Sequence, residues 1–308
     1  MRWQTGINER ESDMSKASQR EQIETGAGFI AALDQSGGST PKALALYGVG
    51  DSDYSSDEEM FAEVQRMRER IILCDAFNRD KVIGAILFER TLDEEIEGRK
   101  VADYLWSQKG IVPFLKTDKG LEDTADGVQM MKPVPGLGST LARAAEMGIF
   151  GTKARSVIHE CNAVGIAAVV GQQFDEARKV LGAGLVPIIE PEVSIKSQTK
   201  AEAEARLRDE ILSQLEELDA GQEVMLKLTL PDEAGLYDEL ADHPRVLRVV
   251  ALSGGYSTDE ACALLARNDK MTASFSRALT EGLTKQMSDA EFAEALSTNI
   301  GKIHRASV

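Results

Sequence analysis

The chain has 308 residues, of which 43% are hydrophobic and 28% charged, so it contains enough apolar material for the core of a large globular domain. Its 51 acidic and 35 basic side chains give a formal net charge of −16, which argues against nucleic acid and anionic membrane surfaces as partners. A local cluster of lysines can nevertheless bind a small anionic substrate.

The N-terminal 25 residues are polar and charged, and they contain no apolar stretch of the length found in signal peptides. No later segment approaches the roughly 18 consecutive apolar residues that a membrane-spanning helix needs. The three cysteines, Cys74, Cys161 and Cys262, are scattered, which is typical of small core residues in a reducing compartment. We therefore expect a cytoplasmic protein in which residues 1–25 form an N-terminal helical extension.

Short apolar segments recur along the whole chain, each bounded by glycine, proline or charged residues. Nearly continuous apolar runs of this length are typical of parallel strands that are covered on both faces. The eight predicted strands are, in chain order, 28–34, 82–88, 111–118, 149–155, 185–192, 223–230, 246–255 and 271–279.

Amphipathic helical patterns lie between and after these segments. The first connection, residues 35–81, is long enough for two helices, and a C-terminal helix is expected at about 288–304. Three apolar faces have helical spacing: Met60, Val64, Met67 and Ile71; Leu207, Ile211, Leu215 and Leu218; and Phe292, Leu296 and Ile300. Capping boxes are predicted for Ser56 with Glu59, Ser257 with Glu260, and Ser288 with Glu291.

Eight strands alternating with helices over roughly 250 residues is the layout of a (β/α)8 TIM barrel. The alternative is a doubly wound open sheet, which usually carries a glycine-rich phosphate loop after its first strand. The segment "ALDQSGGST" follows neither the G-x-G-x-x-G nor the P-loop pattern. We therefore predict one (β/α)8 catalytic domain spanning residues 1–308, with its barrel core at about 28–280.

Polar side chains gather at the C-terminal ends of the predicted strands, which is where TIM barrels build their sites. Taken singly, such residues have ordinary explanations, because a strand lysine is usually ion-paired or extends to solvent and "SGG" is usually a turn. Seven of the eight strand ends carry ionisable groups, however, and burying so many charges is costly unless they form a site. The polar residues at the ends of all eight predicted strands are Asp34, Glu89, Lys116, Asp118, Lys153, Arg155, Glu190, Glu192, Lys227, Ser253 and Arg277.

Lys227 interrupts the apolar segment "VMLKLTL", residues 224–230. Strand side chains alternate between faces, so Met225, Lys227 and Thr229 share one face and the intervening aliphatic residues share the other. The aliphatic face can pack under the outer helices. The pattern therefore predicts that Lys227 points into the barrel.

A buried lysine beside a second cation loses its proton more readily, because desolvation and like charge both disfavour the ammonium form. Lys153 is the obvious second cation. A neutral amine attacks carbonyls and forms a Schiff base, whose iminium accepts electrons without an organic cofactor. Dehydration of the first adduct needs a proton shuttle, which Glu190 or Glu192 can supply if burial raises its pKa toward neutrality.

The last two strands indicate an anion site, because loops after strands seven and eight commonly bind phosphate in such barrels. Glycine backbone N–H groups in "SGG" (Ser253, Gly254 and Gly255) can approach phosphate oxygens, and Arg277 in the "SFSR" segment, which begins at Ser274, adds charge-assisted bonds. A second anion cluster is expected opposite. Two anion sites that flank a reactive lysine suggest a sugar phosphorylated at both ends. The second cluster consists of Ser36, Ser39, Lys116 and Arg155.

Seven motifs occur in an order that is specific as a set: "AALDQSGGSTPKAL", "PFLKTDKG", "FGTKARS", "IIEPE", "MLKL", "LSGGYS" and "SFSRAL". With these motifs the chain resembles the class I fructose-1,6-bisphosphate aldolases, closest to their compact bacterial form, from about Gly28 to Leu279. The resemblance implies reversible cleavage of fructose 1,6-bisphosphate to dihydroxyacetone phosphate and glyceraldehyde 3-phosphate, in glycolysis and gluconeogenesis, without a metal or other cofactor.

The resemblance also implies a role for each matching residue. Lys227 matches the Schiff-base lysine, Glu190 the acid/base carboxylate and Glu192 its partner close to the lysine. Asp34 matches the aspartate that acts on the C4 hydroxyl, and Lys153 the lysine beside the Schiff base. The C1 phosphate is expected at Ser253, Gly254, Gly255, Ser274 and Arg277, and the C6 phosphate near Ser36, Ser39, Lys116 and Arg155.

One departure from the family concerns the C-terminus. Animal members close the site with a mobile tail that ends in tyrosine, whereas this chain ends "GKIHRASV" and has no tyrosine beyond Tyr256. The resemblance therefore leaves open which group protonates the enamine, and whether the protein forms a homo-oligomer.

Three alternatives remain from the sequence. One is another lysine-dependent aldolase or transaldolase with a different sugar phosphate, and another is a barrel that binds phosphate without catalysis. A metal-dependent aldolase is disfavoured, because none of His159, His243 and His304 lies at a strand end with ligand spacing.

Overall fold

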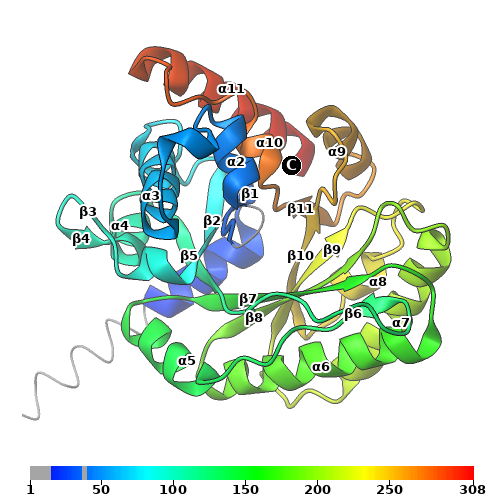
Figure 1. The fold of residues 1–308 in the computed structure, drawn as a ribbon. Helices are drawn as coiled ribbons and strands as arrows, with labels where there is room; N and C mark the ends of the chain where they lie inside the picture. The colour runs from blue at the N-terminus through cyan, green and yellow to red at the C-terminus, as the bar shows by residue number, and fades with distance from the viewer. Residues whose placement is uncertain (1–14, 37–39) are drawn as a thin grey trace, which may run out of the picture.

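The computed structural model of the protein describes residues 15–36 and 40–308, and its centre is a ring of parallel strands. Each predicted apolar segment overlaps one of them, so the eight strands expected from the sequence are confirmed, although β7 and β8 end later than predicted (Figure 1). They are β1 (Phe29–Leu33), β2 (Val82–Leu87), β5 (Val112–Lys116), β7 (Gly151–Ile158), β8 (Val186–Val193), β9 (Val224–Thr229), β10 (Val246–Leu252) and β11 (Met271–Ala273).

The strands are ordered around the ring as they are along the chain, and each pairs in parallel with the next. A doubly wound sheet would reverse this order at its middle, so the predicted TIM barrel is confirmed. β11 returns beside β1, although no backbone ladder joins these two strands in the described part of the chain. At this seam the Thr272 hydroxyl donates to the Gly28 carbonyl.

Helices surround the ring, and α5, α6 and α7 run along the outside of β7 and β8 in Figure 1. None of the helices over residues 15–36 and 40–308 is long and apolar enough to cross a membrane. The helices are 15–25, α2 (Thr40–Leu46), α3 (Asp57–Leu73), α4 (Val101–Ser107), α5 (Leu137–Glu146), α6 (Ala163–Gly182), α7 (Lys200–Glu216), α8 (Asp238–Ala241), α9 (Thr258–Leu265), α10 (Arg277–Thr280) and α11 (Asp289–Ser307), with 3-10 turns η2 (Asp51–Asp53) and η3 (Glu89–Leu92).

Within residues 15–36 and 40–308, three short strands lie outside the ring of eight. β3 (Glu95–Ile96) and β4 (Arg99–Lys100) form a small antiparallel pair after η3. β6 (Val128–Gln129) pairs antiparallel with the end of β7. The two helices expected in the first long connection are α2 and α3, and the expected C-terminal helix is α11.

The predicted helix starts are largely as expected. Ser257 and Ser288 each form both halves of a capping box, which satisfies two backbone N–H groups that the helix itself leaves free. At α3 the Ser56 hydroxyl accepts from the Glu59 N–H, but the Glu59 carboxylate reaches back to the backbone N–H of Ser55. The capping box predicted at Ser56 is therefore only half formed.

Strand alternation divides the apolar residues into two cores. Outward-facing side chains such as Leu226 and Leu228 pack under the helices in the larger core. Inward-facing ones, including Met225, form a separate cluster that fills one end of the barrel interior. The other end of the interior is left to polar side chains. The inner cluster consists of Ile23, Ile30, Ile83, Ile86, Val112, Phe114, Phe150, Ile188, Met225, Leu247 and Val250.

The helix over residues 15–25 closes the N-terminal end of the barrel. Its Ile23 is fully buried in the inner cluster, and the Gln22 amide donates to the carbonyls of Ile83 and Gly110. The Arg20 guanidinium pairs with Glu223, directly before β9. The described part of the predicted extension is therefore a plug, and the site must open at the opposite end.

Candidate active site

A cavity of about 850 Å³ opens at the C-terminal ends of the strands. The predicted convergence of the strand-end residues is confirmed, because the cavity is lined by Ser36, Ser274, Gly254 and every residue of that set: Asp34, Glu89, Lys116, Asp118, Lys153, Arg155, Glu190, Glu192, Lys227, Ser253 and Arg277. Of the other predicted site residues, Gly255 is adjacent to this lining, and Ser39 lies outside the described residues.

Lys227 points into the barrel from β9, as its position in the alternating pattern predicts. Its side chain is 5% exposed, and its amine lies 3.1 Å from Oε1 of Glu190. Met225, on the same face, belongs to the apolar interior below it, whereas Leu226 and Leu228 belong to the outer core. Lys227 therefore sits where the apolar interior ends and the polar cavity begins.

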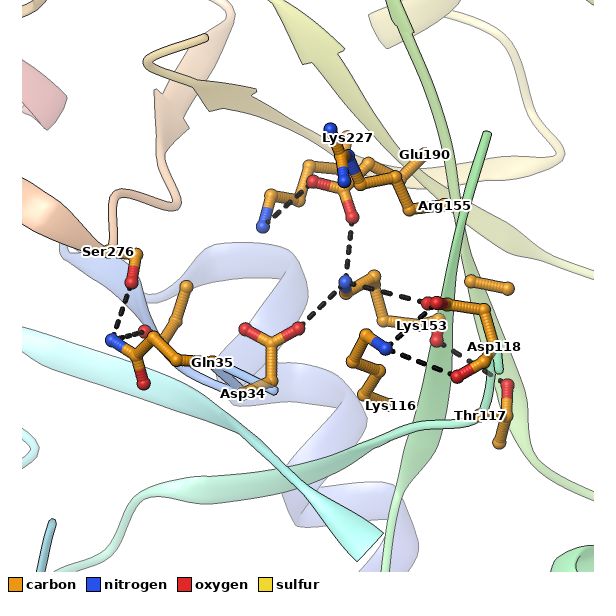
Figure 2. A network of polar contacts seen from close by, with 12 residues as sticks. Asp34, Gln35, Lys116, Thr117, Asp118, Lys153, Arg155, Glu190, Lys227 and Ser276 are labelled. Atoms are coloured by element: carbon orange, nitrogen blue, oxygen red, sulfur yellow. Dashed lines mark hydrogen bonds and ion pairs between the residues drawn. The ribbon is translucent and has the colours of Figure 1, made fainter. Parts of the chain in front are cut away.

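Lys153 lies at the centre of the charged cluster. Its amine is 2.7 Å from Oδ2 of Asp34, 2.9 Å from Oε2 of Glu190 and 3.9 Å from Oδ2 of Asp118 (Figure 2). Burial by itself lowers the pKa of Lys153, but the three carboxylates together hold it well above its usual range. Lys153 is therefore a fixed cation.

The two carboxylates beside Lys153 both have lowered pKa values. Burial by itself raises the pKa of Asp34, but Lys153 and Lys227 outweigh burial and hold the pKa well below its usual range. The pKa of Glu190 is lowered by the same two lysines, again against the effect of burial. The expectation that the pKa of a shuttle glutamate is shifted toward neutrality is therefore wrong for Glu190, because two cations within 3.1 Å of its carboxylate outweigh burial.

Glu192 lies further along β8 than Glu190 and has a different partner. Its carboxylate accepts from Nε of Arg155 at 2.6 Å, and the described ion-pair partner of Lys227 is Glu190. Alternation places Glu190 and Glu192 on one face, but two residues of strand separate them by about 6.6 Å. The position close to Lys227 that the resemblance suggested for Glu192 is thus occupied by Glu190.

Asp118 links two lysines of the site. Its Oδ1 lies 2.8 Å from the amine of Lys116, and its Oδ2 faces Lys153 without a hydrogen-bond partner among the described atoms. The sequence placed Asp118 at a strand end but gave it no role. The signal available in the sequence was its i, i+2 spacing from Lys116, and the direct contact between the two side chains agrees with that spacing.

The loop after β10 and the start of α10 form one wall of the cavity. Gly254 and Gly255 have φ angles of +58° and +125°, which favour glycine, and a Cβ on Gly254 would lie 2.7 Å from Cγ2 of Ile195. A Cβ on Gly255 would lie 3.6 Å from Nη2 of Arg277, so the glycine backbone and this guanidinium are neighbours. Ser274 adds a buried hydroxyl with no partner among the described atoms.

The sequence suggested that Arg277 lies at the end of a strand, and this prediction is wrong. β11 is only three residues long and ends at Ala273, and Arg277 begins the short helix α10 after a turn. The turn brings Arg277 back to the cavity, so its predicted place in the cavity lining is confirmed although it lies on a helix and not on a strand.

The ring order separates the two predicted anion clusters. Lys116 on β5 and Arg155 on β7 lie across the ring from β10 and β11, which precede Ser253 and Arg277. Ser36 differs, because it follows β1, the ring neighbour of β11. Ser36 also lines the cavity, and its membership of the cluster with Lys116 and Arg155 stays a prediction.

Several lining residues were not singled out from the sequence. Gln35, Lys42, Ser276, Arg90, Lys119, Leu46, Phe61 and Phe88 also face the cavity. Gln35 and Lys42 lie inside the first quoted motif, which was the only available signal for them. Among the described residues, no cluster of three or more histidine, cysteine, aspartate or glutamate side chains is arranged to hold a metal ion.

Known proteins are similar to this chain in sequence and in fold. The family model of class I fructose-bisphosphate aldolases matches residues 15–233. A protein named fructose-bisphosphate aldolase class 1 from Synechocystis sp. is 54% identical over 290 residues, which cover 94% of this chain and 97% of that protein.

Two solved structures share the fold at lower sequence identity. Fructose-bisphosphate aldolase from Plasmodium falciparum, in a complex with TRAP and a small-molecule inhibitor, has a TM-score of 0.76 at 21% identity, covering 96% of this chain and 94% of its own. Cgl0159 from Corynebacterium glutamicum has a TM-score of 0.54 at 14% identity, covering 94% and 92%. The family match spans more than half of the chain, and the Synechocystis protein is similar along nearly its whole length. The chain belongs to the class I fructose-bisphosphate aldolase family.

Proposed function

We propose that this enzyme cleaves fructose 1,6-bisphosphate reversibly through a Schiff base between Lys227 and the C2 carbonyl. One observation carries the proposal: a buried lysine amine lies 3.1 Å from a carboxylate, at the floor of a cavity that has cations on opposite walls. The products are dihydroxyacetone phosphate and glyceraldehyde 3-phosphate. The family assignment favours this substrate over those of other lysine-dependent aldolases.

Schiff-base formation begins with proton transfer from Lys227 to Glu190. The neutral amine adds to C2, and the resulting carbinolamine loses water when Glu190 returns its proton to the leaving hydroxyl. The low pKa of Glu190 depends partly on the positive charge of Lys227. When that charge disappears in the neutral amine, the pKa of Glu190 rises, so Glu190 becomes a stronger base as it receives the proton.

Cleavage breaks the C3–C4 bond, and its electron pair moves into the iminium to give a neutral enamine. The C4 hydroxyl proton goes to Asp34, whose carboxylate is held ionised by Lys153 and Lys227. The enamine carries no positive charge on Lys227, so one of the three cations that depress the pKa of Asp34 is lost during this step. Lys153 stays charged and keeps Asp34 and Glu190 in place.

The two phosphates are assigned to opposite walls of the cavity. Ser253, the glycine backbone and Arg277 are proposed to hold the C1 phosphate, since glycine N–H groups and a guanidinium suit phosphate oxygens. Lys116 and Arg155, across the ring, are proposed to hold the C6 phosphate. Lys116 and Arg155 are ion-paired with Asp118 and Glu192, so phosphate binding must compete with these carboxylates.

Borohydride trapping tests the proposal directly. With dihydroxyacetone phosphate present, borohydride should reduce the iminium to a secondary amine and inactivate the enzyme irreversibly. Peptide mapping by mass spectrometry should find the adduct on Lys227 and leave Lys153 and Lys116 unmodified. Borohydride without the substrate is the control and should leave activity intact. An adduct on Lys153 or Lys116 in place of Lys227 would refute the assignment of the nucleophile.

A further inference from the structure

A buried arginine behind the active site has no carboxylate partner among the described residues. Arg68 on α3 is 2% exposed, and no described aspartate or glutamate forms an ion pair with it. Its Nε is buried without a hydrogen-bond partner among the described atoms. Burial lowers the pKa of Arg68 to about 10, an effect that the charge of Asp34 only partly opposes. Burying an unpaired cation lowers the stability of the fold, which suggests that the contacts of Arg68 serve a function.

The contacts of Arg68 reach the ends of the first two strands. Its Nη2 donates to the backbone carbonyl of Gln35 at 2.5 Å, and its Nη1 donates to the Thr91 hydroxyl at 3.3 Å. Its guanidinium also lies 5.8 Å from the centre of the Phe88 ring. Gln35 directly follows Asp34, so Arg68 holds the backbone one residue beyond this carboxylate.

The side chain of Gln35 continues the connection toward β11. Its Nε2 donates to the Ser276 hydroxyl at 2.7 Å, and Ser276 directly precedes Arg277 (Figure 2). This bond crosses the seam between β1 and β11, where no backbone ladder joins the strands in the described part of the chain. Every other pair of neighbouring ring strands shares a backbone ladder, so side chains must supply the connection at this seam.

We propose that Arg68, Gln35 and Ser276 form a strut across the open seam, and that Arg68 is thereby a positioning residue that sets the distance from Asp34 to Arg277. The inference rests on the proposed function, because it assigns Asp34 to the C4 hydroxyl and Arg277 to the C1 phosphate. A bound sugar spans these two groups. A strut between them therefore determines whether C4 meets Asp34 when the phosphate is bound.

The kinetic test compares Arg68→Met with Arg66→Met. Arg66 is on the same helix, pairs only with Glu63 among described residues and has a side chain that is 63% exposed, so it controls for loss of charge. Arg68→Met should lower kcat for fructose 1,6-bisphosphate roughly 10- to 100-fold, since small misplacements of reacting groups have effects of this size. KM should change less, Arg68→Lys should recover part of kcat, and Arg66→Met should stay within about twofold of the parent.

A double-mutant cycle separates a strut from ordinary structural support. Arg68 and Ser276 share Gln35 as a neighbour, so if they act through it, Arg68→Met combined with Ser276→Ala should lower kcat less than the product of the two single effects. Multiplicative effects would overturn the proposal, as would an Arg68→Met enzyme that is less stable but has normal kcat. If Arg68→Met fails to fold, the same cycle with Arg68→Lys decides between these outcomes.

A measurement without substrate separates this inference from the proposed function. If the strut holds the two sides of the seam, amide hydrogen exchange at Ser36 and Arg277 should be faster in Arg68→Met than in Arg66→Met. Unchanged exchange would refute the strut. If the parent enzyme failed to cleave fructose 1,6-bisphosphate but exchange was faster in Arg68→Met as expected, the proposed function would be wrong and the strut would still be supported.

Discussion

At the residue scale, the site is organised by one fixed cation among three carboxylates. The amine of Lys153 lies within 2.9 Å of Asp34 and Glu190 and faces Asp118. Each buried charge would be costly alone, and removing Lys153 leaves Asp34 without an ion-pair partner among the described residues, whereas Glu190 keeps Lys227 and Asp118 keeps Lys116. Lys153 therefore has a structural role that can be measured separately from catalysis.

We predict that Lys153→Met destabilises the protein by about 3–5 kcal/mol at pH 7, the usual effect of breaking a buried ion pair. The folded-state pKa values of Asp34 and Glu190 are depressed, so their contribution to stability is present above their ordinary pKa of about 4 and is lost as pH falls through the depressed values. The raised pKa of Lys153 contributes below its ordinary value of about 10.4 and is lost only as pH rises through the raised value.

In the variant the carboxylates lose this cation, so their pKa values rise and they bind protons in the folded state. The deficit relative to the parent protein should therefore shrink between pH 7 and pH 5, as measured by urea denaturation at both values. Lys119→Met is the control, because Lys119 pairs with Glu89 at the partly exposed rim and should contribute about 1 kcal/mol or less. A deficit for Lys153→Met that did not change with pH would contradict this account of the cluster.

Glu190 is the second residue whose role can be isolated. Glu190→Gln should lower kcat by roughly two to four powers of ten, the usual contribution of general acid–base catalysis. The amide is nearly isosteric, so circular dichroism should show a folded protein. Glu192→Gln is the matched comparison, since Glu192 contacts Arg155 rather than Lys227. Near-normal turnover of Glu190→Gln together with a slow Glu192→Gln would move the proton shuttle to Glu192.

At the scale of elements, the helix over residues 15–25 and the loops around the cavity lie at opposite ends of the barrel. Ile23 packs into the inner apolar cluster and Gln22 holds carbonyls of the second strand and of the chain before the third. This helix completes the barrel interior, whereas the strand-end loops carry the chemistry.

We predict that Ile23→Ala lowers the free energy of unfolding by about 2–5 kcal/mol, because it leaves a cavity where an aliphatic side chain was fully buried. Urea denaturation should report this loss, while kcat/KM of the folded enzyme stays within about twofold of the parent value. Glu21→Ala, at an exposed position of the same helix, should change neither quantity appreciably. A large fall in kcat/KM for Ile23→Ala would mean that the two ends of the barrel are coupled.

At the scale of the whole molecule, closing the ring places distant strands on opposite walls of one cavity. β5 and β7 carry Lys116 and Arg155, and the chain after β10 and β11 carries the glycine loop and Arg277. This arrangement matches a substrate with a phosphate at each end, and it predicts different effects for the two walls.

Arg277→Ala should weaken the hold on the C1 phosphate by about 1.5–3 kcal/mol, the usual contribution of a charge-assisted hydrogen bond. That corresponds to a loss of about 10- to 150-fold in kcat/KM, for both fructose 1,6-bisphosphate and fructose 1-phosphate. Arg155→Ala should reduce kcat/KM much more for the bisphosphate, because fructose 1-phosphate has no C6 phosphate to lose. If the two variants showed the same substrate pattern, the assignment of two separate phosphate sites would be wrong.

Much of this molecule is encoded locally. The eight strands, the inward position of Lys227 and the polar strand ends all depend on spacings of one or two residues, which the chain displays directly. Once the strands form a parallel ring, their C-terminal ends must meet, so the convergence of the polar strand-end residues on one cavity followed without any knowledge of individual contacts. The N-terminal plug did not follow, because the pattern within residues 15–25 does not show what its single buried isoleucine packs against.

The pairing of charges was decided only by the tertiary structure. Alternation assigned Glu190 and Glu192 to one face but not to a depth in the barrel, and depth is what pairs Glu190 with Lys227 and Glu192 with Arg155. The depressed pKa of Glu190 follows from two lysines on other strands, so no local spacing could predict its direction. Arg68 shows the same limit: it lies 33 positions from Gln35 in sequence, and only packing of α3 against the barrel brings its guanidinium to that carbonyl.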